Sequence, residues 1–241
     1  MKITYNNTDI DFFNFELPKE LFVSLSGGLD SASAMYLVCK HFPEIEIIPF
    51  TARDVNAPFD AEAAEDIVFW FQKEFPNITI KDIQIFDFND QDESFVSNTI
   101  VDNEIKNDKE FYGMNRVQVS KMIQIEDIKN QMIEGTLNAM ILDGITLNPP
   151  IEDMKRVGFY EKAERRRDPG HIPKVVLKPV MYKPFKNVDK KFIADIYKGN
   201  NLMDSLYTLT RSCVGTAKDT NYFLHECGEC FWCLEKKWAF A

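Results

Sequence analysis

The octapeptide Ser24-Leu25-Ser26-Gly27-Gly28-Leu29-Asp30-Ser31 joins an apolar, β-leaning run at residues 21–25 to a helical pattern that stops at Pro43. The backbone N–H groups at the start of a helix lack intrahelical partners and, together with the helix dipole, attract anions. The paired glycines let the backbone approach a phosphate with no side chain in between. The octapeptide therefore predicts a phosphate-binding loop between a strand and a helix.

The polar side chains of this loop extend the prediction to a metal-bound polyphosphate. Ser26 and Ser31 add hydroxyl donors, whereas the carboxylate of Asp30 would repel phosphates unless a divalent cation lay between them. Mg²⁺ is usually held by one or two carboxylates together with substrate phosphates. An ordinary Ser/Gly turn is the alternative, but the order strand, SGGxDS, helix is far more restrictive than a Gly-Gly pair. The loop has neither the GK[ST] of a Walker loop nor a GxGxxG turn.

Hydrophobic periodicity around the loop predicts a doubly wound α/β fold with a parallel sheet. Residues 46–50 indicate a strand, with Pro49 near its end or at an edge. An amphipathic helix is predicted at residues 60–75 and a third strand at 78–88. Alternating strands and helices at this spacing are typical of a parallel sheet with helices on its faces. Further along, the patterns predict a helix at 118–134, a strand at 137–143, a long loop at 145–173, an extended segment at 175–182 and a helix at 189–198.

Length and charge limit the classes of protein. A chain of 241 residues, 45% of them hydrophobic, can form one domain with a small appendage, which we place at residues 1–205 and 206–241. The net charge of −10 disfavours nucleic acid as a partner and favours a small anionic substrate. No apolar run approaches the roughly 18 residues of a membrane span. The first residues lack the charged segment followed by an apolar segment that is typical of a signal peptide, and we expect them to form a strand or arm. We therefore predict a cytoplasmic protein.

Four of the five cysteines gather near the end of the chain, at Cys213, Cys227, Cys230 and Cys233. Four thiolates suffice for a closed tetrahedral Zn²⁺ site, which leaves no open position and implies a structural role. Free thiols, a redox C-x₂-C pair and an iron–sulfur cluster are the alternatives, and the spacing and ligand type favour zinc. Cys39 falls on the apolar face of the first predicted helix and is expected in the core.

The S-G-G-L-D-S segment resembles the signature of the PP-loop ATP pyrophosphatases. The resemblance implies a parallel sheet that binds ATP across its strand ends and an enzyme that cleaves ATP between the α and β phosphates. Such enzymes adenylylate an acid, amide or carbonyl oxygen, and a nucleophile then displaces AMP. By position, the resemblance implies an ATP and Mg²⁺ site made of Ser24, Leu25, Ser26, Gly27, Gly28, Leu29, Asp30, Ser31 and Thr51, with Asp30 and Ser31 catalytic.

The cysteine tail resembles one branch of that superfamily, the 7-cyano-7-deazaguanine synthases. Leu209-Thr210-Arg211-Ser212-Cys213 and Cys227-Gly228-Glu229-Cys230-Phe231-Trp232-Cys233 match the tail in which four cysteines hold zinc. This resemblance implies ATP-dependent conversion of 7-carboxy-7-deazaguanine and ammonia to 7-cyano-7-deazaguanine. From the charge and the lack of a long apolar run we expect neither a nucleic-acid nor a membrane partner, and a homodimer stays open. The middle of the chain departs from the branch. Where the branch has an Asp-Tyr-Gly-Gln segment, this chain has Thr51-Ala52-Arg53-Asp54. The Pro-Asp-Cys-Arg stretch of the branch is absent, and Asn148-Pro149-Pro150 lies near its expected place.

Several alternatives stay open. An RNA thiolase or lysine–tRNA ligase of the same superfamily is disfavoured by the net charge and the tail, whereas a relative that stops at the amide or uses another acid is not. A degenerate loop kept as a zinc-stabilised binding module is disfavoured by the intact Asp30. Arg165-Arg166-Arg167 could close over pyrophosphate or form a solvated turn, and Asp143 could meet a ligand at a strand end or cap a turn.

Overall fold

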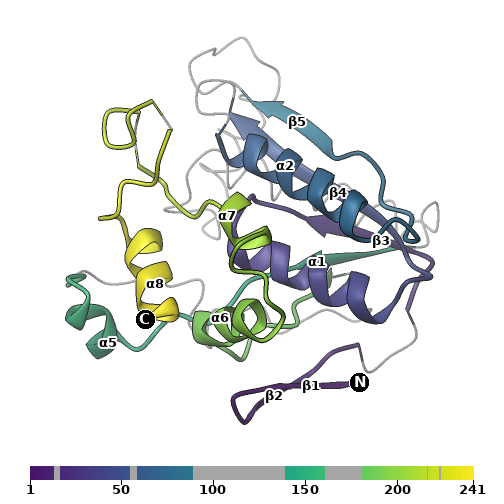
Figure 1. Cartoon of the computed structure of the whole chain (residues 1–241), viewed down its shortest axis with the longest axis horizontal. Helices are drawn as coiled ribbons and strands as arrows, with labels where there is room; N and C mark the ends of the chain where they lie inside the picture. Colours follow the sequence, from purple (N-terminus) through teal and green to yellow (C-terminus); the bar gives the residue numbers. More distant parts are fainter. Residues whose placement is uncertain (14–16, 55–58, 89–138, 161–180, 216, 223) are drawn as a thin grey trace, which may run out of the picture.

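The computed structural model describes residues 1–13, 17–54, 59–88, 139–160, 181–215, 217–222 and 224–241. Its centre is a five-stranded parallel sheet in the order β5-β4-β3-β6-β7 (Figure 1), which confirms the predicted parallel α/β fold. The strands are β3 (Glu20–Ser24), β4 (Glu46–Asp54), β5 (Gln84–Phe88), β6 (Ala139–Asp143) and β7 (Met181–Tyr182).

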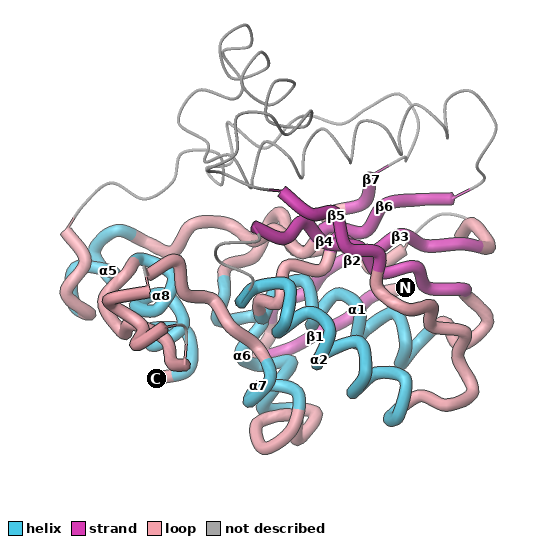
Figure 2. The backbone as a smooth tube through the Cα atoms, turned by 90° about the horizontal axis from the view of Figure 1, so that it is seen from above, coloured by secondary structure: helices cyan, strands magenta, loops and turns pink. Residues whose placement is uncertain are grey.

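The described helices lie on one side of this sheet or beyond its end (Figure 2). They are α1 (Leu29–His41), α2 (Phe59–Glu74), α5 (Ile151–Arg156), α6 (Lys190–Gly199), α7 (Leu206–Leu209) and α8 (Phe231–Phe240). The N-terminal segment forms an antiparallel hairpin of β1 (Lys2–Tyr5) and β2 (Thr8–Asp11), as expected of a packed arm. It lies beside α6 (Figure 1), where the ring of Tyr5 meets that of Phe192 edge-on at 5.6 Å.

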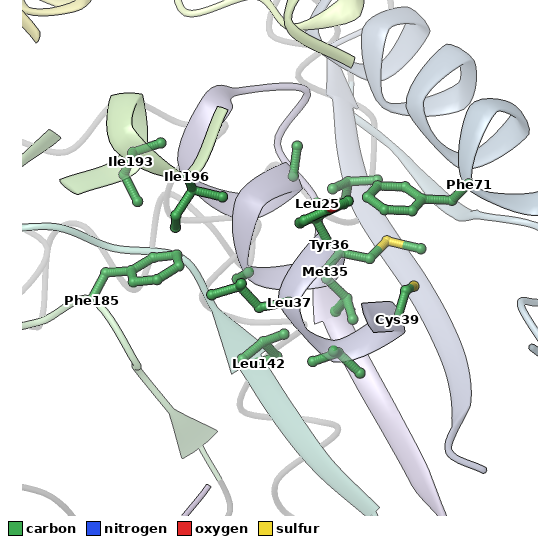
Figure 3. Packing of buried hydrophobic residues seen from close by; sticks show 14 of the residues in the cluster. Leu25, Met35, Tyr36, Leu37, Cys39, Phe71, Leu142, Phe185, Ile193 and Ile196 are labelled. Carbon is green, nitrogen blue, oxygen red and sulfur yellow. The ribbon is translucent and has the colours of Figure 1, made fainter. Parts of the chain in front are cut away.

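Both faces of the central strands bury apolar side chains, as is usual for a parallel sheet. In β3, Leu21 and Val23 pack in the main core, whereas Phe22 belongs to a second cluster on the opposite face. Figure 3 shows the main core, in which side chains of α1 lie between Phe71 of α2 and the isoleucines of α6. Because α1 is covered on several sides, nearly all its residues from Leu29 to Cys39 are buried, and its apolar sequence follows from this position.

The strand order creates a switch point between β3 and β6. From β3 the chain steps to β4 and β5 on one side, whereas β6 and β7 lie on the other. Ser24 and Asp143, the last residues of β3 and β6, stand directly opposite one another. In open α/β sheets, ligands bind outside the carboxyl ends of the strands at such a point. The predicted phosphate loop follows Ser24 and therefore lies at this position.

Pro49 does not end its strand, so the prediction of a strand limited to residues 46–50 was wrong. β4 continues to Asp54, because its pairing changes partner along its length: residues 46–50 pair with β3, and Phe50 to Asp54 pair with β5. The N–H of Ile47 donates to Thr79 on the β5 side, and backbone groups alternate sides along a strand. The missing N–H of Pro49 therefore faces the side where pairing with β5 begins only at Phe50.

Two other predicted elements differ from the structure. The strand predicted at 78–88 is shorter, since only Gln84–Phe88 forms β5 and the earlier part contributes an isolated bridge between Ile47 and Ile80. The predicted loop at 145–173 contains helix α5. Pro150 precedes it, acidic residues occupy its first turn and basic residues its last, which are helix start and stop signals.

The predicted helix at 118–134 and Arg165-Arg166-Arg167 lie outside the described residues, as does most of the predicted segment 175–182. Within the described ranges, no helix combines the length and the apolar character that crossing a bilayer requires. The proposed division at residue 205 stays a prediction.

Candidate functional site

The loop after β3 is held in shape by its own serines. The N–H of Leu25 donates to the carbonyl of Phe50 at 2.9 Å, so pairing with β4 continues one residue past β3. Ser31 Oγ then accepts from the N–H of Ser26 at 3.2 Å and donates to the carbonyl of Gly28, the residue that caps α1, at 3.3 Å. Ser31 thus ties the start of the loop to the first turn of the helix. The first N–H groups of a helix have no intrahelical acceptor, so a loop that opens a helix in this way suits an anion.

Gly27 is required by the backbone. Its φ is +73°, and a Cβ at this position would lie 2.4 Å from the carbonyl oxygen of Asp60 in the first turn of α2. No side chain fits in that space, and L-residues rarely adopt this φ. The loop therefore packs directly on the start of a second helix.

Asp30 lies in the first turn of α1 and is held by two partners on its Oδ2 atom. Thr146 Oγ1 donates to it at 3.4 Å, and Lys190 Nζ lies 3.3 Å away. The same Lys190 Nζ lies 2.9 Å from Oε2 of Glu235 on α8. The side chains of Lys190 and Glu235 are 3% and 0% exposed, whereas that of Asp30 is 22% exposed. Lys190 therefore bridges the partly accessible carboxylate of the loop and a fully buried one.

The end of β6 forms the other side of the switch point. Asp143 Oδ1 accepts from the N–H of Ile145 at 3.3 Å, which is a turn-type hydrogen bond, and its Oδ2 lies 3.4 Å from Nζ of Lys183. The structure thus places Asp143 at the strand end expected of a ligand contact and also gives it the turn hydrogen bond of the alternative interpretation.

The four tail cysteines converge. Their sulfur atoms all lie within 4.8 Å of one another, and those of Cys227 and Cys233 are 3.9 Å apart. Thiolates at about 2.3 Å from a shared tetrahedral ion are separated by about 3.8 Å, so the cluster fits a single ion. The N–H groups of Gly215 and Cys227 both donate to Cys213 Sγ at 3.2 Å. Such donors orient and stabilise metal-bound thiolates.

The thiols of the cluster share protons. The hydrogen bond between Cys230 and Cys233 lowers the pKa of the Cys230 thiol and raises the pKa of the Cys233 thiol, whereas metal binding requires all four as thiolates. Cys39 is separate: it is buried in α1, and burial raises the pKa of its thiol. The expectation that Cys39 belongs to the core is therefore confirmed.

The cysteine cluster is attached to the phosphate loop. The N–H of Arg211, two residues before Cys213, donates to the carbonyl of Gly27 at 2.8 Å. The Arg211 guanidinium lies 5.2 Å from the centre of the ring of Phe59, which packs against Cys213 and Cys233. The tail thus reaches the loop through both backbone and side-chain contacts.

A second ion pair fixes the segment that makes these contacts. Glu226 accepts from the N–H of Ser212 at 2.8 Å, and its carboxylate lies 3.1 Å from Nζ of Lys236 on α8. Lys236 Nζ also donates to the carbonyl of Thr210 at 3.4 Å.

Five residues that lie at the site were not predicted from the sequence: Lys190, Glu235, Thr146, Lys183 and Gly144, which packs against the backbone of Asp30 and Ser31. The sequence marks Lys190 only as a residue at the start of a helix. The residue before it, Asp189, is the N-cap of α6 and accepts from the N–H of Lys191 at 2.9 Å. Thr51, expected to belong to the ATP site, is fully buried in β4, and its role stays a prediction.

Fold and site together define a parallel α/β protein with a serine- and glycine-rich loop between strand and helix at its switch point, and with a four-cysteine cluster attached to that loop. No protein-family model matches the chain, and no curated protein matches it. Similar solved structures include the U34-tRNA thiolase NcsA from Methanococcus maripaludis with its [4Fe-4S] cluster, at 15% identity and a TM-score of 0.46, over 95% of this chain and 66% of that one.

Two synthetases are also similar. The NMN synthetase from Francisella tularensis has 12% identity and a TM-score of 0.45, over 88% of this chain and 71% of that one. A glutamine-dependent NAD⁺ synthetase from Acinetobacter baumannii, in complex with ADP, has 14% identity and a TM-score of 0.41, over 84% of this chain and 33% of that one. Function is therefore inferred from this chain's own residues.

Proposed function

We propose that the chain is an ATP-using enzyme of the PP-loop type, which cleaves ATP between the α and β phosphates to adenylylate a small acid. The observation that carries the proposal is the position of the SGGLDS loop. It leaves β3 at the switch point, opens α1, and carries Asp30 beside Thr146 from the opposite side of that point. A loop of amides and hydroxyls with one carboxylate suits a cation-bound polyphosphate.

In this proposal the protein acts by positioning and by neutralising charge. The amides at the start of α1 and the hydroxyls of Ser26 and Ser31 hold the pyrophosphate in line with the attacking carboxylate. Asp30 would hold Mg²⁺, which when bound offsets the charge that develops on the leaving pyrophosphate. No covalent enzyme intermediate is required.

We further infer that the acid is 7-carboxy-7-deazaguanine and that the nucleophile is ammonia. Support comes from the tail, whose Cys213, Cys227, Cys230 and Cys233 form one cluster beside the loop. The carboxylate oxygen attacks the α phosphate and releases pyrophosphate; ammonia then adds to the acyl carbon and AMP leaves, which forms the amide. The amide oxygen is adenylylated by a second ATP, and loss of AMP with the two amide protons gives the nitrile.

Product analysis tests this substrate assignment. We expect mass spectrometry to detect the nitrile from either the carboxylate with ammonia or the amide alone, with two ATP consumed per nitrile from the carboxylate and one from the amide. Accumulation of the amide, with no nitrile from either input, would identify an amide-forming relative. Consumption of neither input would remove the deazaguanine assignment and leave the ATP proposal to be tested separately.

We propose a structural Zn²⁺ ion for the four cysteines. In a four-iron cluster each thiolate binds its own iron, so the ligands stand further apart than four thiolates that share one ion. Sulfur atoms within 4.8 Å of one another therefore favour the single ion. Zinc is the common ion of closed four-cysteine sites.

A further inference from the structure

The ion pair between Lys190 and Glu235 is not expected to add to the free energy of unfolding. Both side chains are almost fully buried, and the cost of removing two charges from water often exceeds their mutual attraction. A pair of apolar side chains of similar volume would serve the core equally well or better. Its position is informative, however, because the same Lys190 Nζ also contacts the loop carboxylate of Asp30.

The charges of the three groups explain why both acids are present. With Lys190 alone, Asp30 would form a neutral pair, and the ammonium would compete with a cation for its carboxylate. Glu235 takes part of the positive charge of Lys190, so Asp30, Lys190 and Glu235 together keep one net negative charge at the head of α1. One buried charge within about 10 Å of a divalent cation changes its binding by roughly tenfold or more.

We propose that Glu235 is a positioning residue for the nucleotide site: it holds Lys190 so that the carboxylate of Asp30 stays available to the cation that accompanies the nucleotide. This inference rests on the proposed function and adds a residue from the cysteine tail to it. Glu235 follows Cys233 by two residues on α8, whose N-cap is Cys230. The helix that carries Glu235 therefore begins within the cysteine cluster.

The test compares the affinity of α,β-methylene-ATP in buffer with Mg²⁺ and in buffer without added divalent cation, measured by calorimetry on the zinc-loaded full chain. In the wild type we expect Mg²⁺ to tighten binding. In Glu235→Gln this tightening falls roughly tenfold, whereas affinity without Mg²⁺ is unchanged or increases, because one negative charge near the phosphates has been removed. Metal content and thermal melting establish that the variant is folded.

A loss of affinity confined to the Mg²⁺ condition separates positioning from a merely structural role. A parallel loss in both conditions, or wild-type values in both, would overturn the inference and leave the ATP proposal standing. A wild type that binds the analogue in neither condition would overturn both. If Glu235→Gln does not fold, the double variant Lys190→Met/Glu235→Gln buries no unpaired charge and restores the net charge. Its Mg²⁺-dependent tightening should stay within about threefold of wild type, and its loss would contradict the proposal.

Discussion

Gly144 lies against the peptide that joins Asp30 to Ser31. A Cβ built on Gly144 would lie 2.5 Å from the carbonyl carbon of Asp30 and 2.6 Å from its oxygen. The residue after β6 thus supports the first turn of α1 through backbone contact alone. The two sides of the switch point are in contact at the residue on which the proposed metal site depends.

Gly144→Ala should therefore affect the nucleotide site as well as stability. The added methyl group must displace the Asp30–Ser31 peptide, which costs about 1–3 kcal/mol of unfolding free energy. We expect the rate of AMP formation to fall about tenfold or more, because small displacements of positioning groups slow a reaction strongly. Chemical denaturation and initial-rate measurements test both effects.

Gly158→Ala is the matched control for this substitution. A Cβ there meets no atom within 4 Å, but φ is +94°, so we expect a loss of about 1–2 kcal/mol from the backbone alone. AMP formation should stay at the wild-type rate. Equal rates for the two variants would mean that Gly144 has no special relation to the site.

Asp30→Ala should lower AMP release about 100-fold or more, because it removes the proposed cation ligand at the leaving pyrophosphate. The melting temperature should change little, since Lys190 keeps its contact with Glu235. Asp66→Ala makes the same chemical change on the exposed side of α2 and should alter neither property. Wild-type AMP release by the folded Asp30 variant would remove Asp30 from the mechanism.

Cys230→Ser should lose metal and stability together, because structural zinc contributes on the order of 10 kcal/mol to the folding of small zinc domains. Cys39→Ala is the control: it removes a buried thiol from the core, costs about 1 kcal/mol, and should retain one zinc per chain. Elemental analysis and thermal melting measure both. A brown, iron-containing wild type, or one that carries far less than one zinc per chain, would contradict the zinc assignment.

The parts of the site that could be predicted from the sequence are local in the chain. The loop follows its strand and opens its helix within a few residues, so the orphan amides, the paired glycines and Asp30 can be read together. The cysteines could be predicted because thiolate ligands and C-x₂-C spacing reflect metal geometry directly.

The remaining site residues depend on tertiary contacts. Lys190 and Glu235 are charged residues of helices and would ordinarily face solvent; only the packing of α6 and α8 near α1 buries them beside Asp30. Gly144 is required only because β6 lies next to β3. Likewise, Pro49 can lie within β4 because pairing with β5 begins only at Phe50, so no hydrogen bond from residue 49 is needed on that side. No local sequence pattern reveals this pairing.

The most direct test of the central claim is to identify which phosphate bond of ATP is broken. ATP, Mg²⁺, ammonia and 7-carboxy-7-deazaguanine are incubated with the purified full chain, and the phosphorus products are followed by ³¹P NMR, with Asp30→Ala as the blank. We expect AMP and pyrophosphate in equal amounts, and neither product in the Asp30→Ala reaction. ADP with inorganic phosphate, or AMP formed equally by Asp30→Ala, would contradict it.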